Sequence, residues 1–415
     1  MRKLAVVLLA LAMVLSCGVL SACNKTPAQK EDILVWAADE VVAFTQTKCD
    51  EFLAANPDLA EKFTITVSAM SEGEAATQMI TDVEAGADVF AFAQDQLGRL
   101  VQAGALSELG GTFLTDAKAN NDAGSVAAAT MGDKMYAYPL TSDNGYFLFY
   151  DKSVVTDPST LDGILTQCET AGKKFYMENQ SGWYLVSFFF GAGCHYTTTA
   201  DNQGNIVAVD CDFNSAGGLG AFKALIAMAQ SKGFQRSDKF SDQFNPDGGQ
   251  AGAAISGTWD AATIKGFLGD KYGVAKLPTM TVNGQQVQMG AWGGFKLMGV
   301  NPTQSEEALT ASHKLAAYLT GGDVQLARYG VKGWGPSNKT AQQDPTVQAD
   351  QALAALQAQL AYSPAQPQCS AKYWDKMAAF GTEVNAGTYK ASTDAQLQTV
   401  LDELVAYLKA DVVTQ

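Results

Sequence analysis

Hydrophobic and polar positions alternate with two periods along the first hundred residues. Short apolar or period-two runs predict strands, and runs with apolar residues every three or four positions predict amphipathic helices. The segments alternate strand, helix, strand, helix, strand at residues 33–36, 44–55, 63–67, 75–84 and 88–92. This order predicts a parallel sheet covered by helices, with ligands at the carboxyl ends of the strands.

The same alternation returns in the second half of the chain. We expect strands at residues 146–150, 174–177, 252–259 and 272–278. We expect helices at residues 183–190, 219–231 and 305–319, with a mostly helical tail from residue 345 onward. Because a single core rarely grows beyond about 250–300 residues, a chain of 415 residues predicts two lobes.

A polar stretch, Thr-Ser-Asp-Asn-Gly at residues 141–145, separates two apolar aromatic strands in the middle of the chain. We interpret it as a crossover from one lobe to the other, which would place Asp143 and Asn144 in the cleft between them. A surface turn is the alternative, because Asp-Asn-Gly suits a turn equally well. Residues 289–300 would return the chain to the first lobe, and residues 330–337 would cross a third time.

The first residues have the pattern of an export signal. Arg2 and Lys3 precede an apolar run that is short for a membrane span, and Leu-Ser-Ala comes directly before Cys23. This resembles a bacterial lipoprotein signal over residues 1–22, with Cys23 lipidated; plain secretion with a free Cys23 thiol is the alternative. Residues 23–31 predict a flexible tether, and the body would sit at the extracellular face of the bacterial cell membrane.

The net charge and the histidine and cysteine content argue against several classes of partner and cofactor. A net charge of −15 argues against nucleic acid as a partner and against direct adhesion to an anionic bilayer. With two histidines and no Cys-x-x-Cys motif, the chain has little material for a metal or haem site, so we expect no cofactor. Cys194 and Cys211 flank a hairpin pattern in a secreted setting, which predicts a disulfide between them.

Aromatic residues followed closely by acids or amides lie at several predicted strand ends. Examples are Trp36-Ala-Ala-Asp39-Glu40, Phe92-Ala-Gln94-Asp95-Gln96 and Trp259-Asp260. A pyranose presents apolar C–H faces and a rim of hydroxyls, so a sugar site needs flat aromatic surfaces together with carboxylates and amides. Core packing is the alternative role for any single tryptophan.

Eight short motifs, in order, resemble the maltose-binding-like solute-binding lipoproteins of bacterial carbohydrate ABC importers. Besides the lipoprotein signal they are Leu-Val-Trp at 34–36, Ala-Asp-Val-Phe-Ala-Phe at 87–92, Ala-Tyr-Pro at 137–139, Asp-Asn-Gly-Tyr at 143–146, Tyr-Asp-Lys at 150–152, Ile-Ser-Gly-Thr-Trp at 255–259, Lys-Leu-Pro at 276–278 and Trp-Gly-Gly at 292–294. The resemblance implies an α/β, two-lobe periplasmic-binding-protein fold (type II-like) whose discontinuous lobes are joined by three hinge crossings. Lobe 1 would be residues 32–141 and 291–335, and lobe 2 residues 142–290 and 336–415.

The family's binding positions carry over onto Asp39 or Glu40, Phe92, Asp95, Asp143, Trp183, Trp259 and Trp374, and the crossover, strand-end and aromatic patterns add the other candidates. Ligand contacts are expected from Asp39, Glu40, Phe92, Asp95, Gln96, Asp143, Asn144, Trp183, Trp259, Asp260, Trp292, Trp334 and Trp374. Gln96 stands where maltose binders have a basic residue, and Ser181 stands where they have an acid. These departures make maltodextrin specificity doubtful.

The expected function is therefore non-enzymatic: a lipid-anchored, monomeric component that binds a sugar or oligosaccharide and delivers it to an ABC permease. A polyamine or an amino acid is the alternative solute. A tethered glycoside hydrolase is the rival class, since such enzymes need two carboxyl groups flanking one bond, and Asp95 and Asp143 could take those roles.

Overall fold

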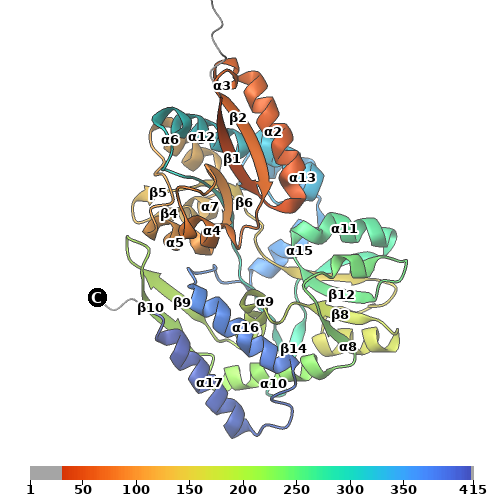
Figure 1. The fold of residues 1–415 in the computed structure, drawn as a ribbon. Helices are drawn as coiled ribbons and strands as arrows, with labels where there is room; N and C mark the ends of the chain where they lie inside the picture. The colour runs from red at the N-terminus through yellow and green to blue at the C-terminus, as the bar shows by residue number, and fades with distance from the viewer. Residues whose placement is uncertain (1–29, 413–415) are drawn as a thin grey trace, which may run out of the picture.

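The computed structural model describes residues 30–412. Two five-stranded mixed sheets form its centre, each covered by helices (Figure 1). The first sheet has the order β2-β1-β3-β16-β6, with bounds Phe63–Ala69, Glu31–Ala37, Val89–Ala93, Lys296–Val300 and Tyr138–Thr141. The second has the order β11-β8-β12-β7-β13, with bounds Phe234–Arg236, Lys174–Met177, Ala251–Ser256, Phe147–Asp151 and Tyr272–Ala275. The predicted α/β, two-lobe fold is confirmed.

The first sheet follows the alternation expected from the sequence. Strand β1 pairs parallel to both β2 and β3, and the returning strand β16 pairs antiparallel to β3 and β6. Its core is apolar on both faces, as a sheet between helix layers requires. The helices of this half are α2 (Val42–Ala55), α3 (Pro57–Ala60), α4 (Ala75–Thr81), α5 (Leu97–Gln102), α6 (Gly111–Asn120), α7 (Ala123–Ala128), α12 (Glu306–Leu319) and α13 (Gly322–Lys332).

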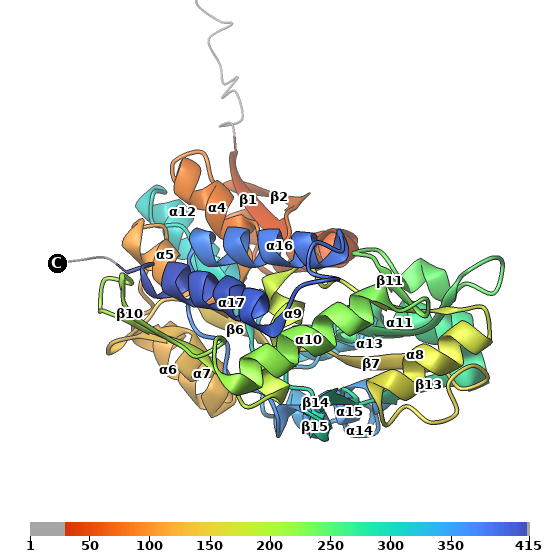
Figure 2. The ribbon, with the colours of Figure 1, turned by 90° about the horizontal axis from the view of Figure 1, so that it is seen from below.

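The second sheet is covered by helices from the middle and the end of the chain. They are α8 (Leu161–Thr170), α9 (Gly182–Gly191), α10 (Ala216–Gln230), α11 (Thr258–Leu268), α14 (Pro345–Gln348), α15 (Gln351–Leu360), α16 (Ala371–Asn385) and α17 (Asp394–Lys409). The C-terminal helices α16 and α17 lie alongside α10 (Figure 2), and α16 also packs on α9. The tail is therefore an integral layer of the second half.

Several predicted element ends are wrong: β13 ends at Ala275, β16 begins at Lys296 and α4 ends at Thr81. The small-residue strand expected over 252–259 ends at Ser256, and Gly257 caps the N-terminus of α11. Trp259 consequently lies in the first turn of a helix instead of at the tip of a strand. Glycine has no side chain to continue the buried face of the strand, which is why the chain can turn into a helix there.

Three crossings connect the two sheets, and they lie side by side. The chain passes from β6 in the first sheet to β7 in the second through residues 142–146, so the polar stretch is a crossover and not a surface turn. The Asn144 amide donates to the carbonyl of Gly294 at 3.2 Å, and the Ser142 amide donates to the carbonyl of Gly335 at 2.9 Å. These bonds tie each of the other two crossings to the first.

The hairpin that contains the expected disulfide forms, but the disulfide does not. Strands β9 (Tyr196–Ala200) and β10 (Ile206–Cys211) pair antiparallel, with Cys211 opposite Tyr196. Cys194 therefore lies two positions away from the residue that faces Cys211. Both cysteines are free and buried, and the Cys194 sulfur lies 3.4 Å from the Ser215 hydroxyl. The predicted Cys194–Cys211 bond is wrong for this structure because the register separates the pair.

Two smaller hairpins complete the described chain: β4 (Thr130–Met131) with β5 (Lys134–Met135), and β14 (Thr279–Val282) with β15 (Gln285–Gln288). No helix within residues 30–412 is both long and apolar enough to cross a membrane. The predicted signal at residues 1–22, the lipidated Cys23 and most of the tether lie outside the described residues.

Candidate functional site

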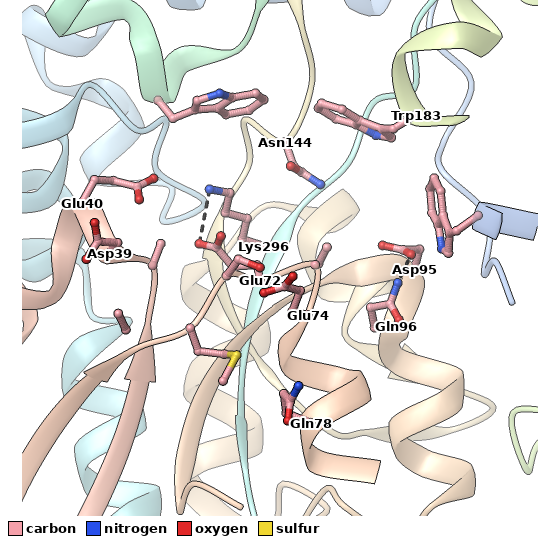
Figure 3. Close-up of a pocket in the computed structure, with 18 of the residues that line it drawn as sticks. Asp39, Glu40, Glu72, Glu74, Gln78, Asp95, Gln96, Asn144, Trp183 and Lys296 are labelled. Atoms are coloured by element: carbon pink, nitrogen blue, oxygen red, sulfur yellow. Dashed lines mark hydrogen bonds and ion pairs between the residues drawn. The ribbon is translucent and has the colours of Figure 1, made fainter. Parts of the chain in front are cut away.

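A cleft of about 740 Å³ opens between the two sheets (Figure 3). Both halves of the molecule contribute to its lining. One wall carries acids and amides, namely Asp39, Glu40, Glu72, Glu74, Gln78, Asp95 and Gln96. The other wall carries the tryptophans Trp183, Trp259 and Trp374. Asn144 in the first crossing, Lys296 and Gln366 line the cleft between the walls.

The topology of the first sheet explains the acidic wall. Strands β1, β2 and β3 are parallel, so their carboxyl ends meet at one edge of the sheet. Asp39 and Glu40 follow β1 in a short 3-10 turn, Glu72 and Glu74 follow β2, and Asp95 follows β3. Five carboxylates therefore converge although more than fifty residues separate the first from the last.

Asp95 is the most deeply placed of these acids. It is 2 % exposed, and Gln96 donates a side-chain hydrogen bond to its carboxylate. Arg99 in turn donates to the side-chain amide oxygen Oε1 of Gln96 at 2.8 Å. Burial raises the pKa of Asp95 to about 7, because removing the carboxylate from water outweighs the hydrogen bonds that favour its charge.

The aromatic wall is a connected set of rings. The ring centres of Trp183 and Trp259 lie 5.8 Å apart, and Tyr146 packs edge-on to Trp183 at 4.7 Å. Trp183 also donates from Nε1 to the side-chain oxygen of Gln366 at 3.2 Å. Trp374 rests edge-on against Tyr373 at 4.9 Å. The rings are therefore held by neighbours and present fixed faces to the cleft.

Lys296 joins the two walls. Its side chain is 7 % exposed, and its ammonium lies 3.3 Å from a carboxylate oxygen of Glu72 (Figure 3). The same ammonium lies 3.8 Å from the ring centre of Trp334 and 5.5 Å from that of Trp259. Because Lys296 belongs to the first sheet and Trp259 to a helix of the second half, the two halves touch at this point.

Most of the candidates from the sequence line the cleft. They are Asp39, Glu40, Asp95, Gln96, Asn144, Trp183, Trp259 and Trp374. Phe92 and Trp292 are fully buried core residues, and Trp334 lies beneath the Lys296 ammonium. None of these three lines the cleft.

Two acids expected in the cleft have other partners. Asp143 is 2 % exposed, and one of its carboxylate oxygens accepts from the Thr258 hydroxyl at 2.5 Å and from the Gly335 amide at 2.6 Å. It therefore ties the first crossing to the third and to the start of α11. Asp260 accepts from the Ser256 hydroxyl at 2.6 Å, and its pKa is raised by burial and by the nearby Glu40 and Asp242. Asp95 and Asp143 do not face a common cavity as a hydrolase pair would.

Six polar residues of the cleft are missing from the sequence-based set: Ser71, Glu72, Glu74, Gln78, Lys296 and Gln366. Glu72 and Glu74 follow a predicted parallel strand, so the rule that selected Asp39 could also have selected them. Lys296 sits among small and apolar residues of the return strand, and Gln366 lies in an irregular segment. Neither position carries a local signal of its role.

Comparison with known proteins now decides the family. Residues 48–355 match the family model described as bacterial extracellular solute-binding protein. The chain belongs to this family. This solute-binding protein is 27% identical over 297 residues to the galactooligosaccharide-binding protein of Bacillus subtilis (strain 168), with 68% of each chain covered.

Two solved structures have the same fold as the solute-binding protein. One, determined with acarbose, is 29% identical with a TM-score of 0.80, covering 92% of this chain and 99% of the other. The maltodextrin binding protein of L. casei BL23, solved without ligand, is 27% identical with a TM-score of 0.74 and covers 92% and 99%.

Proposed function

We propose that this solute-binding protein binds a sugar or oligosaccharide in the interlobe cleft and delivers it to the permease of an ABC importer. The observation that carries the proposal is the opposition of a wall of carboxylates and amides to a wall of tryptophan rings. The rings match the apolar faces of a pyranose, and the carboxylates and amides match its hydroxyl rim.

The roles of individual residues follow from their positions. Trp183, Trp259 and Trp374 would stack on sugar faces, while Asp95 on the polar wall and Asn144 between the walls would bond hydroxyls. A volume of about 740 Å³ lies within the range of small-molecule sites, roughly 300–1,000 Å³. The names of the relatives, which concern a galactooligosaccharide, acarbose and maltodextrin, support a saccharide ligand.

A thermal-shift screen of the chain from residue 24 onward tests the proposal. The arms are mono- and oligosaccharides, polyamines and amino acids. A ligand at 100 times its dissociation constant adds about 2.7 kcal/mol to the free energy of unfolding. We expect stabilisation in the saccharide arm, with no product formed on long incubation. Stabilisation only by polyamines or amino acids would replace the proposed solute, and turnover would replace binding by hydrolysis.

We also propose that the protein acts as a monomer held at the extracellular face of the membrane by lipid on Cys23. The residues from Cys23 to the first strand are polar and carry no apolar anchor of their own. Without acyl chains such a tether has no affinity for a bilayer. Cys23→Ala should therefore leave the protein in the medium or as uncleaved precursor, as fractionation and immunoblotting would detect. Membrane retention of a Cys23→Ala protein whose signal has been cleaved would contradict the anchor.

A further inference from the structure

The charges in the cleft are strongly unbalanced. Five acidic side chains line it, from Asp39, Glu40, Glu72, Glu74 and Asp95, and the ammonium of Lys296 is the only cation among the lining residues that the structure describes. That ammonium already forms an ion pair with Glu72. Among the ion pairs of residues 30–412, none involves Asp39, Glu40 or Glu74. Arg328 and Arg99 lie close enough to interact with Glu72 and Asp95, but the three exposed acids form no ion pair, so they give the mouth of the cleft a negative potential.

A second observation is that this cleft already surrounds one cation, the ammonium of Lys296. The Lys296 ammonium is almost fully withdrawn from water, and it is held by a carboxylate and the faces of two tryptophans. Carboxylate and indole face together form a site that stabilises organic ammonium groups. The same two group types recur elsewhere in the lining, where Trp183 and Trp374 share the cavity with Asp95.

The helix N-termini of the second half do not offset this potential. The three cleft tryptophans lie in the first turns of α9, α11 and α16, where backbone amides could attract an anion. In α9 and α16 the side chains of Ser181 and Ser370 accept one of these amides. In α11, Asp260 occupies the first turn and adds a further carboxyl group. Anionic ligands therefore find no unpaired cation among the described lining residues. Serine side chains cap α9 and α16, and α11, which has no side-chain cap, carries Asp260 in its first turn.

We propose that the cleft selects saccharides by charge: it rejects those bearing carboxylate, sulfate or phosphate groups, and it binds a protonated amino sugar more tightly than its neutral counterpart. The inference rests on the proposed function and names the substrate class of the same site. Glu40 and Glu74 are its specificity-determining residues. Their carboxylates line the cleft, and neither is engaged in an ion pair with this chain.

Matched ligands on one skeleton test the proposal. Cellotriose, chitotriose with free amines and N-acetylated chitotriose share β-1,4-linked pyranose rings and differ at one substituent. Trigalacturonate and maltotriose extend the set to an anion and to another linkage. Titration calorimetry at low and high sodium chloride measures each affinity. We expect chitotriose to bind at least fivefold tighter than cellotriose at low salt, an advantage that shrinks at high salt by screening, and no detectable binding of trigalacturonate.

Charge-neutralising variants assign the effect to residues. Glu40→Gln and Glu74→Gln should each weaken chitotriose binding severalfold and leave cellotriose binding nearly unchanged. Glu84→Gln is the matched control, because it removes the same charge from an exposed position of the same half outside the cleft lining. Its effect on both ligands should be negligible.

The outcomes separate the inference from the function on which it rests. If cellotriose or maltotriose binds as tightly as chitotriose, or if trigalacturonate binds, charge selection is overturned and saccharide binding stands. An equal loss for Glu84→Gln and Glu40→Gln would also overturn it, since the effect would then be long-range. If no saccharide binds at either salt concentration, the inference and the proposed function fall together.

Discussion

Asp95 provides a test of the cleft that needs no ligand, because its carboxylate is held where charge is costly. Burial raises its pKa from an ordinary value of 3.8 to about 7. Between these pH values the folded protein retains a proton that the unfolded chain has released. The contribution of Asp95 to stability is thus fully present below about pH 4 and is lost as the pH rises through about 7.

The size of this effect follows from the interval between the two pKa values. Each unit corresponds to about 1.4 kcal/mol, so ionising Asp95 costs the folded state about 4 kcal/mol above pH 7. Asp95→Asn removes the charge and keeps an oxygen that can accept from Gln96. We expect its free energy of unfolding to equal that of the parent near pH 4 and to exceed it by up to about 4 kcal/mol at pH 8.

Urea unfolding of both proteins at pH 4, 6 and 8 measures this difference directly. Gln78→Glu, which adds a carboxylate at the solvent side of the cleft lining, serves as the comparison for an exposed acid and should show a much smaller pH dependence. If the difference in free energy of unfolding between Asp95→Asn and its parent is the same at all three pH values, ionisation of Asp95 does not destabilise the folded protein. That result would refute the reasoning.

The same residue links stability to binding. A sugar hydroxyl that donates to Asp95 favours the ionised form, so binding near pH 7 should release a proton and weaken as the pH falls below 7. Calorimetry in two buffers with different ionisation enthalpies would count the released proton. The Asp95→Asn variant should bind more weakly and release none, which would make this residue a case of stability given up for function.

Three further predictions concern other parts of the fold. Trp259→Ala removes a face of the aromatic wall and should weaken saccharide affinity about tenfold to a hundredfold, or roughly 1–3 kcal/mol, by calorimetry; Trp36→Ala, in a strand away from the lining, should spare affinity. Asp143→Ala leaves the Thr258 hydroxyl and the Gly335 amide without their acceptor, at about 1–3 kcal/mol each, and should lower the melting temperature by roughly 2–7 °C; Asp143→Asn should recover much of the loss, and equal losses would mean that the hydrogen bonds are not responsible. Burial raises the pKa of Cys194 to about 11 and of Cys211 to about 12, so both thiols should react with a thiol reagent only after unfolding, and a reductant should leave the melting temperature unchanged.

The sequence was sufficient to predict a structural feature wherever one local rule determined that feature. Periodicity located the strands of both sheets except β11, and the rule on the carboxyl ends of parallel strands placed Asp39 and Asp95 in one cleft. The same rule was not applied to Glu72 and Glu74, which it would have found. The expected disulfide failed over a register offset of two residues, and a hairpin pattern cannot fix its register without the turn geometry.

The remaining wrong or missing predictions concern residues whose roles depend on tertiary contacts. Asp143 has the sequence context of a cleft residue, but Thr258 and Gly335, more than a hundred residues away, occupy its carboxylate. Lys296 is held by an ion pair with Glu72, which follows β2, and by the rings of Trp259 and Trp334. These three residues come from three other parts of the chain. No local pattern encodes such partners, because each depends on how the two halves meet.

The meeting of the two halves also explains why a ligand should close them. The acids follow the strand ends of one half, and the tryptophan rings lie at the helix starts of the other half. Neither half alone therefore offers a pyranose both the polar contacts and the aromatic faces that it requires. Ser142, Asp143 and Asn144 cross-link the three crossings by hydrogen bonds, so we expect any relative motion of the halves to occur about these crossings. The Lys296 contact with Trp259 exists only while they are together, and a ligand that fills the cleft adds its own contacts to both walls. A solute that satisfied one wall alone would bind without favouring closure, because it would have equal affinity for the open and closed states.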